Sequence, residues 1–123
     1  MFARSRPAYA TALPNLLPPR AVEYEILARA TRQLLSASER REKDFPKFVS
    51  ALHYNEMVWR TLAADVADDA NALPTALRAS LLSLYEFVQT HSAKVLRDKS
   101  ETDVLVDINT AVLRGLRGDG GAS

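Results

Sequence analysis

The sequence predicts an all-α protein, a single small antiparallel bundle of about four helices that follows an irregular, proline-rich N-terminal arm. Three observations support this fold class. Apolar residues recur at helical spacing in the long segments, no segment alternates in the manner of a strand, and prolines and glycines gather at the ends and turns. With 123 residues and 47% hydrophobic content, the chain has the size and composition of one globular domain.

Three regions follow from this pattern: an arm over residues 1–18, a bundle domain over 19–117 and a flexible tail over 118–123. Four of the six prolines lie between positions 7 and 19. The arm also carries large apolar residues, namely Phe2, Tyr9, Leu13, Leu16 and Leu17. Two interpretations stay open for it: a strap that lies on the bundle, or a segment that a partner orders.

The first helix is expected to start near Pro19, a residue that suits the first helical position. Its apolar stripe is Ile26, Leu27, Ala30, Leu34 and Ala37. The polar run 36–43 has no apolar stripe and predicts a frayed helix end and a loop. Asp44 then suits the cap of a second helix, with Pro46 in its first turn.

The second and third helices carry apolar seams with the same period. The first seam is Phe48, Leu52, Asn55, Trp59, Leu62 and Val66, and the second is Leu77, Leu81, Leu84, Val88, His91 and Val95. Between the seams, the segment 71–74 predicts a turn, because Pro74 disfavours a helical conformation at Leu73. Matching seams joined by a short turn predict an antiparallel hairpin.

A charged break over 94–102 separates the third helix from a last helix over about 103–116, with Ser100 or Thr102 as its cap. The stripe of the last helix is Leu105, Ile108, Val112 and Leu116, with Asn109 on the same face. Gly115 and Gly118 are expected to end this helix.

The composition excludes several classes of function. There are no cysteines, the two histidines lie on different helices, and no nucleophile motif or phosphate-binding loop is present. Asp65, Asp68 and Asp69 are more simply explained as helix-end residues than as paired catalytic carboxylates. We therefore expect no catalytic, cofactor-binding or metal-binding residues. No segment has the length of a membrane span or a signal sequence, which predicts a cytoplasmic protein.

The charge pattern gives little support to nucleic-acid binding. The net charge is +1, distributed as +4 over residues 1–43, −3 over 44–70 and zero over 71–123. A basic strip is formed by Arg29, Arg32, Arg40, Arg41 and Lys43. Because no groove-reading element or stacking platform accompanies the strip, DNA binding is not expected and RNA binding is only an alternative.

Polar residues on apolar stripes are the candidates for specificity. A buried asparagine costs stability and can fix helix register or partner choice. Asn55 and Asn109 either hydrogen-bond a neighbouring helix end inside the chain or grip the backbone of a partner. Arg78 either pairs with Asp65 or Asp68 across the turn or contacts a partner.

These residues, in their order and spacing, resemble the FlaF family of flagellar-biosynthesis regulators over about residues 20–118. The resemblance runs through an asparagine before a tryptophan, an asparagine-x-leucine-proline turn, a leucine-rich helix and a closing isoleucine-asparagine pair. It implies partner-binding candidates at Asn55, Trp59, Asn71, Arg78, Tyr85, Asp107 and Asn109. It implies structural roles for Asp65, Leu73, Pro74, Leu77, Leu81, Leu84, Ile108, Gly115 and Leu116.

The resemblance also implies a function. Proteins of this family look like flagellin-specific partners that act as secretion chaperones toward the flagellar type III export apparatus and support flagellin synthesis together with FlbT. The terminal helices of flagellin would be the bound segment. The alternative is a post-transcriptional regulator that binds flagellin mRNA directly or with FlbT, and a third possibility is a helical scaffold for another partner.

Overall fold

A computed structural model describes residues 19–98 and 102–117 of the chain. The expectations for the arm, for the tail and for a cap at Ser100 lie outside the described residues. The described part contains α2 (Pro19–Glu39), α3 (Phe45–Ala67), α4 (Thr75–Arg97) and α5 (Thr102–Arg117), and no strand. The predicted all-α bundle is therefore confirmed.

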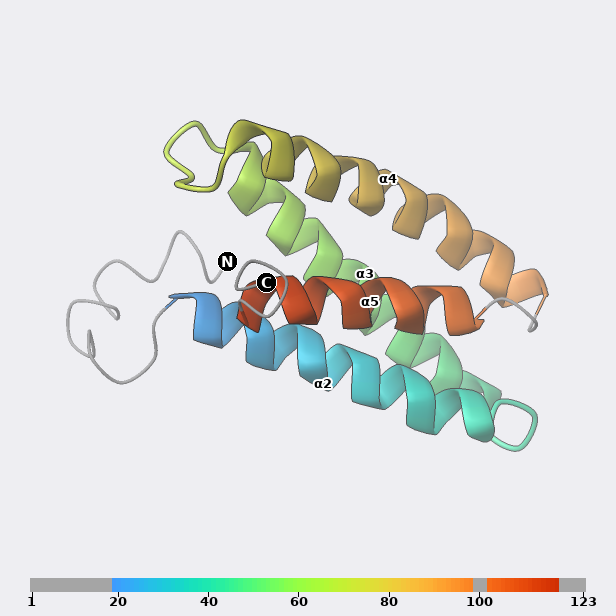
Figure 1. Ribbon diagram of the computed structural model, residues 1–123. Helices are drawn as coiled ribbons and strands as arrows, with labels where there is room; N and C mark the ends of the chain where they lie inside the picture. The colour runs from blue at the N-terminus through green and yellow to red at the C-terminus, as the bar shows by residue number, and fades with distance from the viewer. Residues whose placement is uncertain (1–18, 99–101, 118–123) are drawn as a thin grey trace.

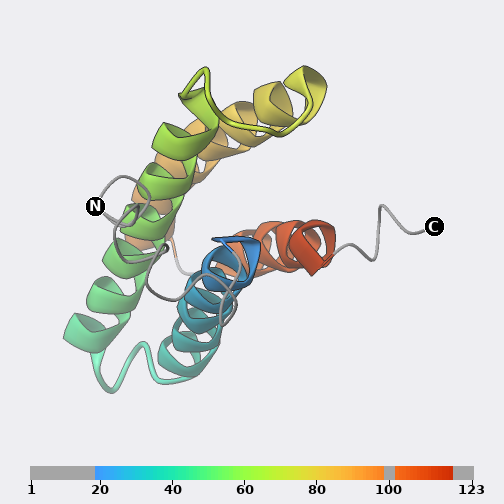
Figure 2. The ribbon, with the colours of Figure 1, turned by 90° about the vertical axis from the view of Figure 1, so that its left-hand side faces the viewer.

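The helices form two pairs that meet at one end and diverge at the other. In Figure 1, α5 lies beside α2, and α3 crosses behind them to reach α4. Figure 2, seen from the end where α2 begins, shows the α3–α4 pair separating from the α2–α5 pair toward the turn after α3. Helix α4 therefore packs mainly on α3 and only slightly on α5.

The core draws on all four described helices. Its most enclosed large side chains are Trp59, Phe48, Leu27, Leu34, Leu52, Val66, Val88, Val95 and Leu105, each less than 2% exposed. Burial of each such side chain stabilises the fold by about 1.5–3 kcal/mol. The backbones of α3 and α5 do not come close to one another, so large side chains fill the space between them.

Local sequence features set most helix ends. The side chain of Asp44 accepts a hydrogen bond from the backbone N–H of Lys47 at 3.2 Å, as expected of an N-cap. The first helix runs to Glu39, further into the polar run than expected, and Gly115 lies within α5, which ends at Arg117. The last helix therefore ends within one residue of the expected end at Leu116, and it tolerates Gly115 in its last turn because one glycine there costs only about 1 kcal/mol.

The structure corrects the expectation for Leu77. The seam of the third helix placed it in the core, but 45% of it is exposed, whereas Leu81 on the same seam is 7% exposed. The reason is the divergence of the two helix pairs, which leaves the first turn of α4 at the rim of the bundle (Figure 2). Leu84 is half-buried and packs against the edge of the core.

Candidate functional site

A buried network of polar side chains joins α2, α3 and α5. Asn109 of α5 accepts a hydrogen bond on Oδ1 from the indole Nε1–H of Trp59, at 2.8 Å. Its Nδ2 donates to Oδ1 of Asn55 at 2.7 Å and to the hydroxyl of Thr31 at 3.1 Å. The Thr31 hydroxyl in turn donates to the carbonyl of Leu27 at 2.8 Å. One amide therefore connects three helices.

The network is enclosed by protein. Asn55, Trp59 and Asn109 are each 0% exposed, and Thr31 is 7% exposed. The Nδ2 of Asn55 has no hydrogen-bond partner among the described residues. Such a buried orphan donor costs about 1–3 kcal/mol, so the network fixes the position of α5 more than it adds net stability.

Enclosure decides what these three residues offer to a partner. In this conformation Asn55, Trp59 and Asn109 present no surface that another protein can touch. The asparagines hydrogen-bond within the chain, but to each other and to the side chains of Trp59 and Thr31 rather than to a helix end. The partner contact expected for them stays a prediction, and it requires that α5 first move away.

The turn between α3 and α4 is closed by two polar side chains. The Nδ2 of Asn71 donates to the carbonyl of Asp65 at 3.2 Å, and its Oδ1 accepts from the backbone N–H of Leu73 at 2.9 Å. Arg78 donates from Nε to the carbonyl of Val66 at 2.7 Å and from NH2 to the carbonyl of Asp68 at 3.0 Å. These donors satisfy carbonyls that the end of α3 leaves free.

Arg78 thus bonds to backbone oxygens rather than only to the carboxylates considered from the sequence. This arrangement explains why the turn needs an asparagine, a proline and an arginine at these spacings. Pro74 stands just before α4, and Asn71 and Arg78 cap the preceding helix from both sides of the turn. In this conformation both side chains build the hairpin, and their expected partner contact stays a prediction.

A second arginine clamp was not expected from the sequence. Arg41, in the loop after α2, donates to the carbonyls of Val95 and Leu96 at 2.9 and 3.1 Å, at the end of α4. Its guanidinium carbon also lies 4.6 Å from the ring centroid of Phe48. The one available signal was the spacing from Arg41 to Phe45 and Phe48, which places two aromatic rings near the cation.

Two partner-binding candidates lie nearer the surface. Tyr85 of α4 is half-buried against the core, and Asp107 of α5 is exposed. They belong to different helices. The structural candidates Leu73, Ile108 and Leu116 are half-buried around the core.

Among the described residues, no group of three or more histidine, aspartate or glutamate side chains gathers in a way that would hold a metal ion. His91 is buried and stacks on Phe87 with ring centroids 5.1 Å apart. Burial raises the pKa of the Glu56 carboxyl, and the charges of His53 and Arg60 partly oppose this effect.

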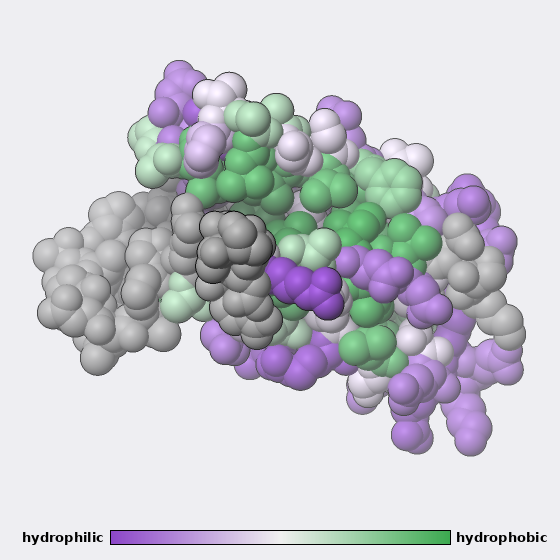
Figure 3. Space-filling view, in the orientation of Figure 1, coloured by the Kyte–Doolittle hydropathy of each residue, from purple (hydrophilic) through white to green (hydrophobic). Residues whose placement is uncertain are grey.

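The outer surfaces carry the remaining features. Six large apolar side chains of the described part are at least 40% exposed: Leu35, Phe45, Met57, Leu77, Phe87 and Leu96. Figure 3 shows apolar side chains gathered along α4 and in the space between α4 and α5. None of the described helices is both long and apolar enough to cross a membrane.

The fold and its polar network define a class of protein, a small helical bundle. Its polar network and its arginine clamps hold the helices together, and several large apolar side chains are exposed on its surface. The family model described as "Flagellar protein FlaF" matches residues 5–116 of the chain. The chain belongs to the FlaF family of flagellar proteins, which is not a known enzyme family. Comparison with the curated proteins and with the solved structures gave no match.

Proposed function

We propose that this FlaF-family chain is a non-enzymatic, cytoplasmic regulator of flagellar biosynthesis that binds flagellin, protects it before export and supports its synthesis. The observation that carries this proposal is the apolar row on α4. Leu77, Leu84 and Phe87 share one face of the helix through their spacing of seven and three residues. Leu77 is 45% exposed and Phe87 is 44% exposed.

Helix α4, which carries the row, packs mainly on α3 and makes little contact with α5. Helix α4 diverges from α5 toward the turn after α3 (Figure 2). Apolar side chains are visible at the surface between the two helices (Figure 3). Large apolar residues at helical spacing are what an amphipathic helix of another protein requires in a groove. An exposed apolar patch of this kind marks an interaction surface more often than an accident of sequence.

Flagellin supplies the matching chemistry. The resemblance stated from the sequence implies that its terminal helices are the bound segment, and unassembled amphipathic helices otherwise associate with one another. A terminal helix that lies along α4 would cover its own apolar face and the row of Leu77, Leu84 and Phe87 together. The bound flagellin would then stay monomeric until the flagellar type III export apparatus receives it.

The test is binding of the full chain to purified monomeric flagellin, measured by isothermal titration calorimetry and gel filtration. We expect a stable complex that Phe87→Glu weakens at least tenfold. Leu35→Glu is the matched control, because Leu35 on α2 is equally exposed at 44%. This control should change the affinity less than twofold.

Two results would contradict the proposal in different ways. If the folded wild-type chain forms no complex with flagellin, flagellin binding itself is wrong. If Phe87→Glu and Leu35→Glu have equal effects, flagellin binds elsewhere and the role of the α4 row is wrong. Circular dichroism of both variants checks that each keeps its helices.

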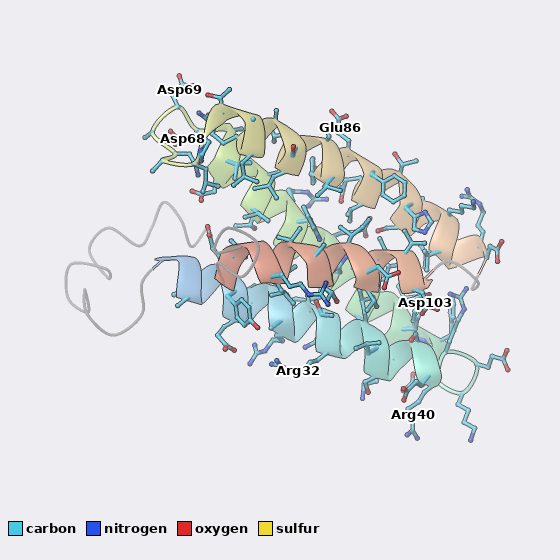
Figure 4. All side chains as sticks on the ribbon, in the orientation of Figure 1. Arg32, Arg40, Asp68, Asp69, Glu86 and Asp103 are labelled. Carbon is cyan, nitrogen blue, oxygen red and sulfur yellow. The ribbon has the colours of Figure 1, made fainter. Side chains whose placement is uncertain are left out.

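Direct binding to flagellin mRNA, alone or with FlbT, has weaker support from the described residues. Arg41 was one of the strip of basic residues, but its guanidinium is engaged by the carbonyls at the end of α4. Arg32 of α2 and Arg40, just after the end of α2, do project outward (Figure 4). A low-salt RNA titration that shows salt-sensitive binding, lost in an Arg32→Glu, Arg40→Glu double variant, would favour this alternative.

A further inference from the structure

The outer face of the α2–α3 pair carries a groove that the proposed flagellin site does not use. It consists of two adjoining hollows that both include Ser50. One hollow, of about 620 Å³, is lined mainly by apolar side chains, including Ile26, Val49, Met57 and Val58. The other, of about 540 Å³, includes Arg29, Arg32 and Lys47 in its lining. We call the two together the α2–α3 groove.

The apolar end of the groove has an exposed anchor. Met57 is 45% exposed, and its sulfur lies 3.7 Å from NH1 of Arg60. A methionine side chain is unbranched and polarisable, so it adapts to the shape of an incoming apolar surface. Around it, the half-buried Tyr54 and Val58 give the hollow an apolar floor.

The other end of the groove is basic. Arg29, Arg32 and Lys47 are all exposed. No acidic side chain is among the residues that line either hollow. In Figure 4, Arg32 points outward from α2, on the side away from α4. The groove therefore concentrates three basic side chains at one end, beside an apolar surface that has the guanidinium of Arg60 next to Met57, and a fitting ligand carries negative charge at the basic end.

The dimensions of the groove favour a helix as its occupant. Lys47 and Thr61, at the two ends, are separated by 14 residues of α3, or about 21 Å at 1.5 Å per residue. A helix of about 14 residues covers this length. Such a helix binds through an apolar stripe with i, i+3, i+4 spacing, which the run of apolar side chains in the groove accepts.

We propose that the α2–α3 groove is a second docking surface that binds an amphipathic helix of a partner protein, with acidic residues at one end of its apolar stripe. The acidic end lies over Arg29, Arg32 and Lys47, and the apolar stripe covers Met57 and Val58. The surface is separate from the α4 row. With flagellin on the α4 row, as proposed above, the protein would act as an adaptor that holds two partners at the same time.

The chain's own arm is a poor match for this groove. Residues 1–18 include Arg4 and Arg6 and contain no acidic residue. Placing the arm in the groove would bring these positive charges toward Arg29, Arg32 and Lys47. Repulsion between like charges therefore disfavours the arm as the occupant.

The probe is a fluorescein-labelled, 18-residue helical peptide with a leucine stripe and three glutamates at one end. Its control has three lysines in their place. We expect the full chain to bind the acidic peptide at least tenfold more tightly by fluorescence anisotropy. Lys47→Glu should remove most of this preference, whereas Arg114→Glu, at an exposed position of α5, should leave it within twofold.

The apolar end is tested with a matched pair of variants. Met57→Glu should weaken peptide binding at least tenfold. Phe87→Glu changes a residue of nearly equal exposure, 44% against 45%, and should change it less than twofold. Unlabelled flagellin should leave the peptide bound, because the two surfaces are separate. Thermal unfolding of each variant confirms that the bundle is intact.

Several results would overturn the proposal. Equal binding of the two peptides would remove the charge argument, and equal effects of Met57→Glu and Phe87→Glu would place the site elsewhere. Displacement of the peptide by flagellin would mean one shared surface rather than an adaptor. At least tenfold tighter binding after deletion of residues 2–17 would identify the arm as the occupant. A dimer in gel filtration that Met57→Glu dissociates would identify a second copy.

Discussion

Trp59 and Asn109 are joined by a hydrogen bond of 2.8 Å between α3 and α5, two helices whose backbones do not approach one another. The indole fills the space between the helices, and the amide satisfies its N–H. Asn109 also reaches Asn55 and Thr31, so the same side chain determines how α5 sits on both neighbours.

Removing the indole should strongly destabilise the bundle. Trp59→Ala creates a large cavity between α3 and α5 and should lower the free energy of unfolding by about 3–5 kcal/mol. Trp59→Phe keeps most of the volume but removes the N–H donor to Asn109, and should cost about 1–3 kcal/mol. Urea unfolding followed by circular dichroism measures both. An unchanged midpoint for Trp59→Ala would contradict the burial of this side chain.

The two asparagines should act as a unit. Asn109→Ala leaves the Trp59 N–H and the Asn55 Oδ1 without this partner, at a cost of about 1–3 kcal/mol for each buried group. In a double-mutant cycle of Asn55→Ala and Asn109→Ala, we expect a coupling free energy of about 0.5–3 kcal/mol. Urea unfolding of the four proteins gives this value. Strict additivity of the two losses would mean that the pair does not interact.

Arg78 should be required as an arginine. Its Nε and NH2 bond to two different carbonyls, which a single lysine ammonium cannot reproduce with the same geometry. Arg78→Ala should cost about 1.5–3 kcal/mol per charged hydrogen bond lost, and Arg78→Lys should recover only part of this. Thermal unfolding tests the series. Arg114→Ala, at an exposed position, serves as the control. An equally large loss of stability in this control would show that the hydrogen bonds of Arg78 do not explain the effect.

Glu56 should make stability depend on pH in the opposite sense to a paired carboxylate. Because burial raises the pKa of Glu56 in the folded state, folding favours its protonated form. This contribution is fully present below the unfolded-state pKa of about 4.3 and is lost as pH rises through the higher folded-state pKa.

Glu56→Gln should therefore raise the melting temperature at pH 7 and leave it nearly unchanged at pH 4. Differential scanning fluorimetry at the two pH values, with Glu86→Gln on the exposed side of α4 as a control, checks this prediction (Figure 4). A variant that melts lower than the wild type at pH 7 would show that the ionised carboxylate stabilises the fold.

Much of the fold could be predicted because its signals are local. The 4-3-4-3-4 spacing from Phe48 to Val66 requires one helix face, and Asp44 can reach only the N–H groups of its own first turn. The turn at Pro74 follows from the restricted backbone of the preceding residue. These features depend on neighbours within a few positions, so the sequence contains the necessary information.

The candidate site was less predictable because its residues act over long separations. Asn55 and Asn109 stand out in the sequence as polar residues on apolar stripes. That they bond to each other could not be predicted, because they lie 54 positions apart in the chain. The sequence around Thr31 gave no sign that its hydroxyl accepts a hydrogen bond from Asn109, because α5 lies far along the chain from Thr31. Arg41 likewise looked like one member of a basic strip until the end of α4 was placed beside it.

By itself, the sequence determined the helices, their caps, the hairpin at Asn71–Pro74 and the membership in a flagellar family, since these rest on spacing and local backbone preferences. Only the tertiary structure decided which polar groups are enclosed and which apolar groups are left outside. Leu77 and Leu81 share one seam, yet one is exposed and the other is buried. The difference arises because α4 diverges from α5 toward its first turn. Burial of a side chain depends on whether another helix lies opposite it, and the local sequence pattern does not contain that information.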